Sequence, residues 1–341
     1  MALPSTGGTY DELFRPQLNP LAIRKGIVTD AFVRDYHQSA TSLADPAVGL
    51  GDDGYFSPYA QDGYPRDDLL ITSDSANLGF WHLGHLGVDG INFDPQMDSE
   101  EVPTAQTLRP AREDVIREGE MFTIVCLEQT PLVRYLVNEL PLVDVPDLGQ
   151  AHLTIPKPME AGIVERQFIL WGFDGGHFFA RTIPRCSKVK VREFAWKREG
   201  KEGTGVTLDF KVLPCPYVGK PVLEHYEGPA HRALGGYATF PPPAPVATSV
   251  TPEKATITFA EAVGPADPFT YKVYKINSST GERTLATIDT GYPTVAGGTV
   301  TIRVTGISDG VDFTFEVEAT GTNGLTTVSL ESNEITGDDG N

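Results

Sequence analysis

The amino-acid sequence predicts a mainly β protein made of two domains. Short runs rich in Val, Ile, Thr and aromatic residues recur along the chain, and turns rich in Gly, Pro, Asp and Ser separate them, which is typical of strands. Gly (35) and Pro (27) are abundant, and only one segment has the periodicity and end signals of a helix. A proline-rich segment over residues 240–246 separates two parts of different character.

The proline-rich segment has four prolines within residues 241–245. Proline fixes φ and has no backbone N–H, so such a segment joins neither a helix nor a sheet ladder. We therefore predict a stiff, extended linker over residues 240–247 and a separate domain over residues 248–341. Before the linker, we predict an ordered core over residues 76–239 and an irregular N-terminal segment over residues 1–75.

The core is predicted to be an antiparallel meander with one flanking helix of about three turns. Thr130 is an N-cap residue type and Pro131 stands at the favoured first position. Leu132, Val133, Leu136 and Leu140 then form one apolar face, and Pro141 ends the helix. Strands are expected at residues 88–93, 120–127, 162–171, 177–183, 187–197 and 205–213, with a β-bulge at 193–194 where the alternation changes phase.

Residues 1–75 are dominated by Gly, Pro, Asp, Ser and Tyr, and only residues 21–36 have the composition of a short element. Residues 45–68 read as one long loop. A loop of this length is unusual inside a compact domain unless something else orders it. Two explanations remain open at this point: a partner chain orders the segment, or it is disordered.

The C-terminal domain is predicted to be a β-sandwich. Alternation of apolar and polar residues is regular in residues 269–275 and 313–317. Strands are expected at residues 255–259, 270–277, 282–289, 299–305 and 313–320, with a last one near 326–331. A spacing of 10–15 residues with Ser, Thr and Gly in the turns fits this architecture.

The chain is strongly acidic, with a formal charge of −19. Residues after 240 carry 13 acids and 5 bases, and the remainder carries 33 acids and 22 bases, so both parts are acidic. This charge excludes a basic nucleic-acid clamp and is typical of a soluble surface.

The three cysteines, Cys126, Cys186 and Cys215, are odd in number and far apart, so we expect reduced, buried thiols. The first thirty residues contain no apolar signal-peptide region. The apolar run at residues 168–173 is far too short to span a bilayer. These features favour a chain made and kept in cytoplasm.

Sequence motifs for catalysis or cofactor binding are weak. Residues 49–54 match G-x-G-x-x-G, but no strand precedes them and two aspartates would face the phosphates, so we predict a loop. His82, His85 and Asp89 do not have the spacing of a zinc site, so structural histidines are favoured. Residues 174–177, Asp-Gly-Gly-His, are explained by a tight turn between two strands.

Acidic residues are numerous, but no two of them are paired by the sequence as an acid–base couple. Glu100, Glu101, Glu113 and Glu118 are therefore interpreted as a solvated acidic face. Nucleophile-elbow, P-loop, C-x-x-C and EF-hand patterns are absent from the sequence. We predict that the protein is not an enzyme and that it has no catalytic, cofactor-binding or metal-binding residues.

Residues 76–236 resemble the major tail (tail tube) protein of long, non-contractile-tailed phages, particularly those of actinobacteria. The stretches that carry the resemblance are residues 86–91 (LGVDGI), 100–106 (EEVPTAQ), 110–114 (PARED), 122–133 (FTIVCLEQTPLV) and 215–221 (CPYVGKP). The region that resembles this family, residues 76–236, covers near half of the chain. Each motif is weak alone, and their order along the chain is moderately specific.

The resemblance implies a virion structural protein with a β-sandwich or β-barrel core and one flanking helix. Six subunits would close into a ring, and stacked rings would form a tube whose acidic lumen conducts genomic DNA without binding it. Residues 1–75 would then make contacts between subunits. The implied location is the virion tail, after synthesis in the cytoplasm of the bacterial host. The implied partners are further copies of the chain, the tail terminator, the tail tip and the tape measure protein, and no cofactor is implied.

The C-terminal part resembles the immunoglobulin-like or fibronectin-III-like modules that decorate phage tails. Residues 313–324, together with Ser329 and residues 332–334, carry this resemblance. The sequence lacks the early Trp and the inter-sheet cysteine pair of such modules. The resemblance implies a module exposed on the tail surface, and we expect weak, multivalent binding to a host-surface polysaccharide.

Two alternatives belong to other classes of protein. The first is a secreted glycan-active or glycan-binding protein with an accessory fibronectin-III-like domain, which would need secretion, a carboxylate pair and exposed aromatic platforms. The second is a capsid decoration protein or a secretion-system tube subunit. The sequence does not distinguish a tube from a ring that stops stacking.

Overall fold

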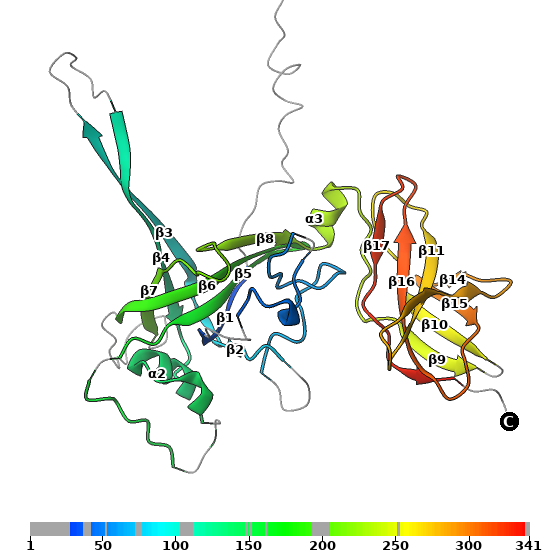
Figure 1. The fold of residues 1–341 in the computed structure, drawn as a ribbon, viewed down its shortest axis with the longest axis horizontal. Coiled ribbons are helices and arrows are strands. Elements are labelled where there is room, and N and C mark those ends of the chain that lie inside the picture. The colour runs from blue at the N-terminus through cyan, green and yellow to red at the C-terminus, as the bar shows by residue number, and fades with distance from the viewer. Residues whose placement is uncertain are drawn as a thin grey trace, which may run out of the picture.

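The computed structural model describes residues 28–36, 42–51, 53–71, 77–102, 112–146, 149, 152–160, 162–191, 205–250 and 253–337. Strands account for 49% of the described residues and helices for 7%, so the predicted mainly β class is confirmed. Figure 1 shows an eight-stranded sheet with α2 (Pro131–Asn138) beside it, and a second β-rich unit beyond α3 (Pro229–Leu234). None of the helices described is long and apolar enough to cross a membrane.

The eight-stranded sheet is antiparallel throughout, in the order β2-β1-β5-β6-β7-β4-β3, with β8 paired to β6. Its strands are β1 (Val28–Asp35), β2 (Trp81–His82), β3 (Leu86–Val102), β4 (Arg112–Cys126), β5 (Arg166–Asp174), β6 (His177–Val191), β7 (Val206–Val212) and β8 (Leu223–Glu227).

The sheet curls until β1 and β3 approach each other at what we call the seam. A Cβ built on Gly90 of β3 would lie only 3.4 Å from Oγ1 of Thr29 in β1. Within the described residues, no ladder joins these two strands. The sheet is therefore a barrel that stays open along one side.

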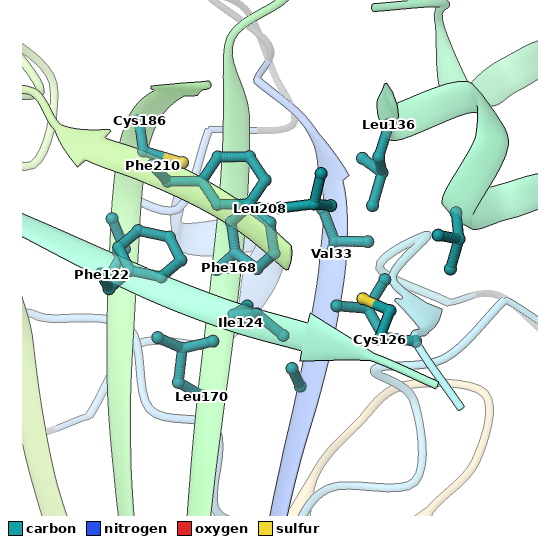
Figure 2. Close-up of a cluster of buried hydrophobic side chains, with 14 of the residues drawn as sticks. Val33, Phe122, Ile124, Cys126, Leu136, Phe168, Leu170, Cys186, Leu208 and Phe210 are labelled. Atoms are coloured by element: carbon teal, nitrogen blue, oxygen red, sulfur yellow. The ribbon is translucent and has the colours of Figure 1, made fainter. Parts of the chain in front are cut away.

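Aromatic side chains fill the concave side of the sheet. The rings of Phe122 and Phe210 stack with centroids 5.1 Å apart, and Phe168 lies 5.2 Å from Phe122 and 4.8 Å from Phe210. Since β4 and β5 are not neighbours in the sheet, a contact between Phe122 and Phe168 requires the curl. Figure 2 shows this inner core, in which Val33, Ile124, Leu170 and Leu208 surround the three rings.

Helix α2 closes the inner core, as the sequence predicts. The Thr130 hydroxyl accepts a hydrogen bond from the Val133 amide, and Pro131 occupies the first turn. Leu132, Val133 and Leu136 are buried against the sheet. The helix has only 8 residues, about two turns rather than three, because Glu139 adopts a left-handed conformation (φ 55) and ends it.

The convex side of β5 carries a second, outer core. Ile169 and Trp171 of β5 pack there against apolar residues of the segment over residues 42–71. The buried residues contributed by this segment are Leu43, Val48, Phe56, Tyr59 and Leu69. β5 is therefore buried on both faces, which explains its continuous apolar run.

The expectation of a short element within residues 21–36 is confirmed, since residues 28–35 form β1 and pair with β5 along their whole length. The interpretation of residues 45–68 as a loop that needs a partner chain or is disordered is corrected, because the described residues between 42 and 71 pack against the same chain's sheet. Neither a partner chain nor disorder is needed to explain them. The composition concealed this order because short Asx-type turns, such as Tyr64 N–H to Asp62 at 3.0 Å, hold the loop in place of ladders. Residues 1–27 lie outside the described residues.

The strand predictions for the core were partly correct. β7 and β5 lie where strands were expected, whereas β3 and β4 are much longer than predicted. The predicted strand 177–183 and the described part of the predicted strand 187–197, residues 187–191, are joined as β6, because a bulge opposite Gln167 removes Pro184 from the ladder. A second irregularity lies at Lys188–Lys190, and the bulge predicted at 193–194 falls outside the described residues. β2, β8 and α3 were not predicted.

The C-terminal unit consists of two facing sheets around one apolar core. One sheet has the order β13-β15-β10-β9 with β14 on β15, and the other has the order β12-β11-β16-β17 with β18 on β16. The strands are β9 (Val246–Val250), β10 (Lys254–Ala260), β11 (Thr270–Asn277), β12 (Arg283–Leu285), β13 (Thr287–Ile288), β14 (Thr294–Ala296), β15 (Thr299–Thr305), β16 (Asp312–Thr320), β17 (Thr326–Val328) and β18 (Ile335–Thr336). Ile257, Val273, Ile302 and Phe315 meet between the sheets. β9, β14 and β18 were not predicted.

The proline-rich segment belongs to this C-terminal unit, which corrects its interpretation as a free linker. Phe240 is 5% exposed and its ring packs edge-on against Phe259 at 5.8 Å. Thr239 pairs with Val263, and the Thr327 hydroxyl donates to the Ala238 carbonyl at 2.9 Å. The unit therefore begins near Ala238 rather than at residue 248. The sequence concealed this boundary because the four prolines indicated a free linker. The residue that anchors the segment in the core, Phe240, precedes them.

Shortening Leu136 to Ala should destabilise the protein by about 2–5 kcal/mol, since Leu136 is 2% exposed and the change leaves a cavity under α2. Urea unfolding followed by circular dichroism measures the loss. Val143→Ala, at an 85% exposed site, is the control and should change stability by less than about 0.5 kcal/mol. Equal effects of the two substitutions would contradict the packing of α2.

Replacing Phe240 by Ala should loosen the C-terminal unit selectively. Hydrogen exchange should accelerate in β10 and β16, because the ring of Phe240 fills their shared core, and should not change in β5 or β7. Val246→Ala, at a half-exposed site in the same stretch, is the matched control. Unchanged exchange in β10 for Phe240→Ala would restore the interpretation as a free linker.

Candidate functional site

The largest unsatisfied feature of the described structure is the outer edge of β3. β3 pairs with β4 on one side, and no described strand pairs with its other side. An unpaired edge presents a row of backbone N–H and C=O groups that another strand can bind. At 17 residues, β3 is far longer than the short edges with which monomeric proteins usually end their sheets.

β3 and β4 extend beyond the sheet as a two-stranded ribbon formed by residues 94–102 and 112–120. Figure 1 shows the ribbon projecting away from the rest of the unit. β4 pairs with β7 only from Met121 onward, so within the described residues the ribbon has no third strand. Met97 is 69% exposed and Ile116 is 64% exposed. A two-stranded ribbon with exposed apolar side chains is marginally stable alone, so a contact surface is indicated.

The ribbon is acidic, with eight acidic residues against two arginines. Its register places like charges directly opposite each other, as with Glu100 against Asp114. Such pairs destabilise a ladder. The predicted solvated acidic face is thus found on the ribbon, where Glu100, Glu113 and Glu118 are exposed.

A cavity of about 920 Å³ lies at the seam. Residues 28–30 of β1, residues 86–91 and Phe93 of β3, and Trp171 and Arg181 of β5 and β6 line it, and we call it the seam cavity. The guanidinium of Arg181 lies 4.3 Å above the ring of Phe93 and forms ion pairs with Glu120 at 2.5 Å and Glu224 at 3.0 Å. The wall of the cavity is therefore mostly apolar and contains one guanidinium, that of Arg181, which two carboxylates hold in place.

His82 and His85, which the sequence interpretation treated as structural, stand on the rim of the seam cavity. His82 Nε2 lies 2.8 Å from Asp30 Oδ2, and its Nδ1 accepts from the Gly84 amide. His85 Nδ1 and the His85 amide both bond Glu128, and these hydrogen bonds lower the pKa of the Glu128 carboxyl. Both histidines are exposed rather than buried, and each joins two segments of the chain.

No group of three or more metal-ligating side chains occurs among the residues that the structure describes. Residues 49–51 and 53–54 form the predicted loop, bridged by Leu50 and Phe56. Asp174 and His177 pair across the tight turn between β5 and β6, with Gly175 at φ +59. The three cysteines are free and buried, as expected, and burial raises the pKa of the Cys126 thiol to about 12.

His225 of β8 couples the sheet to the loop over residues 42–71. Its Nε2 lies 3.1 Å from the Thr182 hydroxyl, and the ring of Tyr59 packs edge-on against it at 6.5 Å. Burial lowers the pKa of His225 to about 4, with the charge of Asp53 acting weakly in the opposite direction. This packing therefore stabilises the neutral form of the His225 imidazole.

No protein-family model matches the chain, and no curated protein matches it. Function is therefore inferred from the unpaired edge, the ribbon, the charge and the motifs of residues 76–236. The sequence did not indicate the seam cavity. Its only local signal is the spacing of Gly84, Gly87 and Gly90, where β3 leaves its register with β4 between Leu86 and Ile91.

Replacing His225 by Gln should flatten the pH dependence of stability between pH 6.5 and pH 4. In this window the unfolded chain binds the proton that folded His225 excludes, so stability falls as the pH falls, by up to about 1.4 kcal/mol per pH unit. Urea midpoints at several pH values measure the slope. His152→Gln, at an exposed site, controls for the loss of a histidine. A slope as steep as that of the unmodified protein would mean that His225 is not buried in the neutral form.

Proposed function

We propose that the chain is a virion structural protein, the subunit of a phage tail tube. The observation that carries this proposal is the unpaired outer edge of β3, continued by the projecting ribbon. The order of the tail-tube-like motifs in residues 76–236 supports it, because residues 86–91 and 100–102 fall on β3, and residues 122–133 span the end of β4 and the start of α2. The motifs thus coincide with the edge strand and its partner.

Assembly would proceed by strand pairing between copies. The free edge of β3 in one subunit would bind an edge in the next, and a rotation that closes would give a ring, six-fold by the resemblance. The ribbon would reach the adjacent ring and fix the stacking. Its exposed Met97 and Ile116 would be buried on contact, which offsets the cost of the like-charge pairs.

The acidic character suits a conduit for DNA. Both parts of the chain carry net negative charge, and a negative wall repels phosphates within a Debye length of about 8 Å at physiological salt. Genomic DNA would therefore slide without binding. The C-terminal unit, with two facing sheets, would decorate the tail surface as an immunoglobulin-like or fibronectin-III-like module and bind host polysaccharide weakly.

Electron microscopy of the negatively stained, purified chain tests the proposal. Rings or tubes with a central channel are expected. A chain that stays monomeric at all concentrations, by imaging and by light scattering, would refute the tail-tube function. Rings that never stack would favour a decoration protein instead.

A proline substitution tests the role of the β3 edge. Pro95 already lies within β3 opposite Glu120, and proline has no N–H, so its nitrogen is expected to face away from β4. Met97, two residues further, has the same orientation. Met97→Pro should therefore spare the β3–β4 ladder, remove an outward donor and prevent assembly.

The matched control is Met97→Thr, which keeps the backbone N–H and should still assemble. Circular dichroism and melting temperature should be the same for both variants. Normal rings or tubes from Met97→Pro would count against strand pairing at this edge, whatever the effect of the threonine.

A further inference from the structure

A cleft of about 1170 Å³ lies between the large sheet and the C-terminal unit, and we call it the inter-unit cleft. It is lined by the segment over residues 42–71, by α3 with the end of β8, and by Glu316 and residues 326–331 of the C-terminal unit. Figure 1 shows α3 between the two units. Ligand sites occur preferentially at such interfaces, and few small-molecule sites exceed about 1,000 Å³, so a ligand of several linked rings fits this volume.

Direct contacts join the two walls of the inter-unit cleft. Asn323 Nδ2 of the C-terminal unit donates to the Gly236 carbonyl at the end of α3, at 2.7 Å. On the other wall, Asp62 of the segment over residues 42–71 is 3% exposed and lines a small void together with Pro242 and Leu330. The cleft is therefore bounded by contacts on both sides and does not depend on one wall alone.

Two exposed tyrosines line the inter-unit cleft. Tyr226 of β8 is 56% exposed, and Tyr237, which follows α3, is 43% exposed. Leu234 and Leu330 are exposed there as well. A tyrosine ring has an apolar face and a polar tip, so it suits a partner that is apolar on one face and polar at its rim. Sugar rings have this character, because their C–H groups form an apolar face and their hydroxyls lie around the edge.

Two ion pairs supply polar groups to the same cleft. Arg66 pairs with Asp68 at 2.6 Å, and Arg232 pairs with Glu227 at 2.9 Å. The side chains of Asp68 and Glu227 remain 38% and 28% exposed. Each pair holds a carboxylate in place and leaves it further acceptor sites, to which the hydroxyls of a ligand can donate. A few such fixed polar groups beside aromatic rings are typical of a ligand site.

The charge of the inter-unit cleft selects against anions. Its lining residues include five carboxylates, against two guanidiniums and His231. The two guanidiniums, those of Arg66 and Arg232, are already paired with carboxylates. An acidic polymer would therefore be repelled, whereas an uncharged one would not.

We propose that the inter-unit cleft binds a short stretch of an uncharged polysaccharide. Its sugar rings would stack on Tyr226 and Tyr237, and its hydroxyls would donate to Asp68 and Glu227. This inference rests on the polysaccharide binding proposed above for the C-terminal unit and deepens it, because it places the site between the two units rather than on the module alone. It does not depend on assembly of a tube.

Calorimetric titration of the full chain with hexasaccharides of mannose, of galactose and of glucose tests the proposal. At least one of them should bind saturably, with one site per chain and a Kd of about 1 mM or below. A hexasaccharide of guluronate, which carries a carboxylate on every ring, should bind at least about tenfold more weakly. Short ligands are used because they cannot bridge several copies of the chain and so report one site.

Matched substitutions locate the site. Tyr226→Ala and Tyr237→Ala should each weaken binding by about tenfold, because each removes a stacking ring. Tyr217→Ala, at a 51% exposed position outside the cleft, should leave binding unchanged. Tyr274 of β11, whose ring lies beside Arg283 on the C-terminal unit, does not line the cleft, and Tyr274→Ala should also leave binding unchanged. Far-ultraviolet circular dichroism on each variant verifies that the fold is retained.

Three results would overturn the proposal. The first is no saturable binding of any of the three uncharged hexasaccharides up to about 10 mM. The second is equal binding of the guluronate hexasaccharide. The third is binding that survives both Tyr226→Ala and Tyr237→Ala, and if Tyr274→Ala abolishes it, the module binds polysaccharide by itself and only the cleft is wrong. Met97→Pro should bind as the unmodified chain does, so failed assembly would count against the tube and not against the cleft.

Discussion

The edges of the large sheet constrain the whole structure, because their backbone hydrogen bonds are not all formed within the chain as described. An antiparallel sheet can close into a barrel and remove its edges, or stay flat and protect them. The sheet over residues 28–227 does neither. It curls far enough for Thr29 and Gly90 to meet, because the rings of Phe122, Phe168 and Phe210 draw β4, β5 and β7 around one core. It stops short of a ladder between β1 and β3, so the seam and the outer edge of β3 keep unpaired groups.

The rigidity of this open sheet comes from burial on both sides of β5. Leu170 faces the inner core and Ile169 the outer core, so the strand is held between α2 and the segment over residues 42–71. A buried ion pair also fixes the position of β5. Arg166, which is 1% exposed, pairs with Asp35 and donates to the Leu140 carbonyl. A charge this deep is tolerated only when it is fully paired, and it ties β5 to β1 and to the end of α2.

Local signals in the sequence were sufficient to predict those elements that depend only on neighbouring residues. The cap at Thr130 and the alternation of β11 and β16 are examples, since a cap or a two-residue period needs no distant partner. Prediction failed where a distant contact overrides local preference. Pro184 suggested a break, yet a bulge opposite Gln167 carries β6 past it. Phe240 precedes four prolines and was predicted to lie in a linker, yet its ring packs against Phe259 in a core. The seam cavity depends on the curl of the whole sheet, so its local signal, the spacing of Gly84, Gly87 and Gly90, was not sufficient to indicate it.

In the proposed assembly, acidic residues would keep a chain with a long exposed edge soluble until that edge pairs with another copy. Charged side chains are a common protection for edge strands, because two like-charged edges repel before their backbones can pair. In the ribbon, β3 carries Asp94, Asp98 and Glu100, and β4 adds Glu113 and Asp114. Pairing must therefore overcome repulsion that salt screens and that burial of Met97 and Ile116 offsets. Under the proposed assembly, the same residues that oppose indiscriminate aggregation would restrict association to a surface that supplies both apolar contact and the correct register.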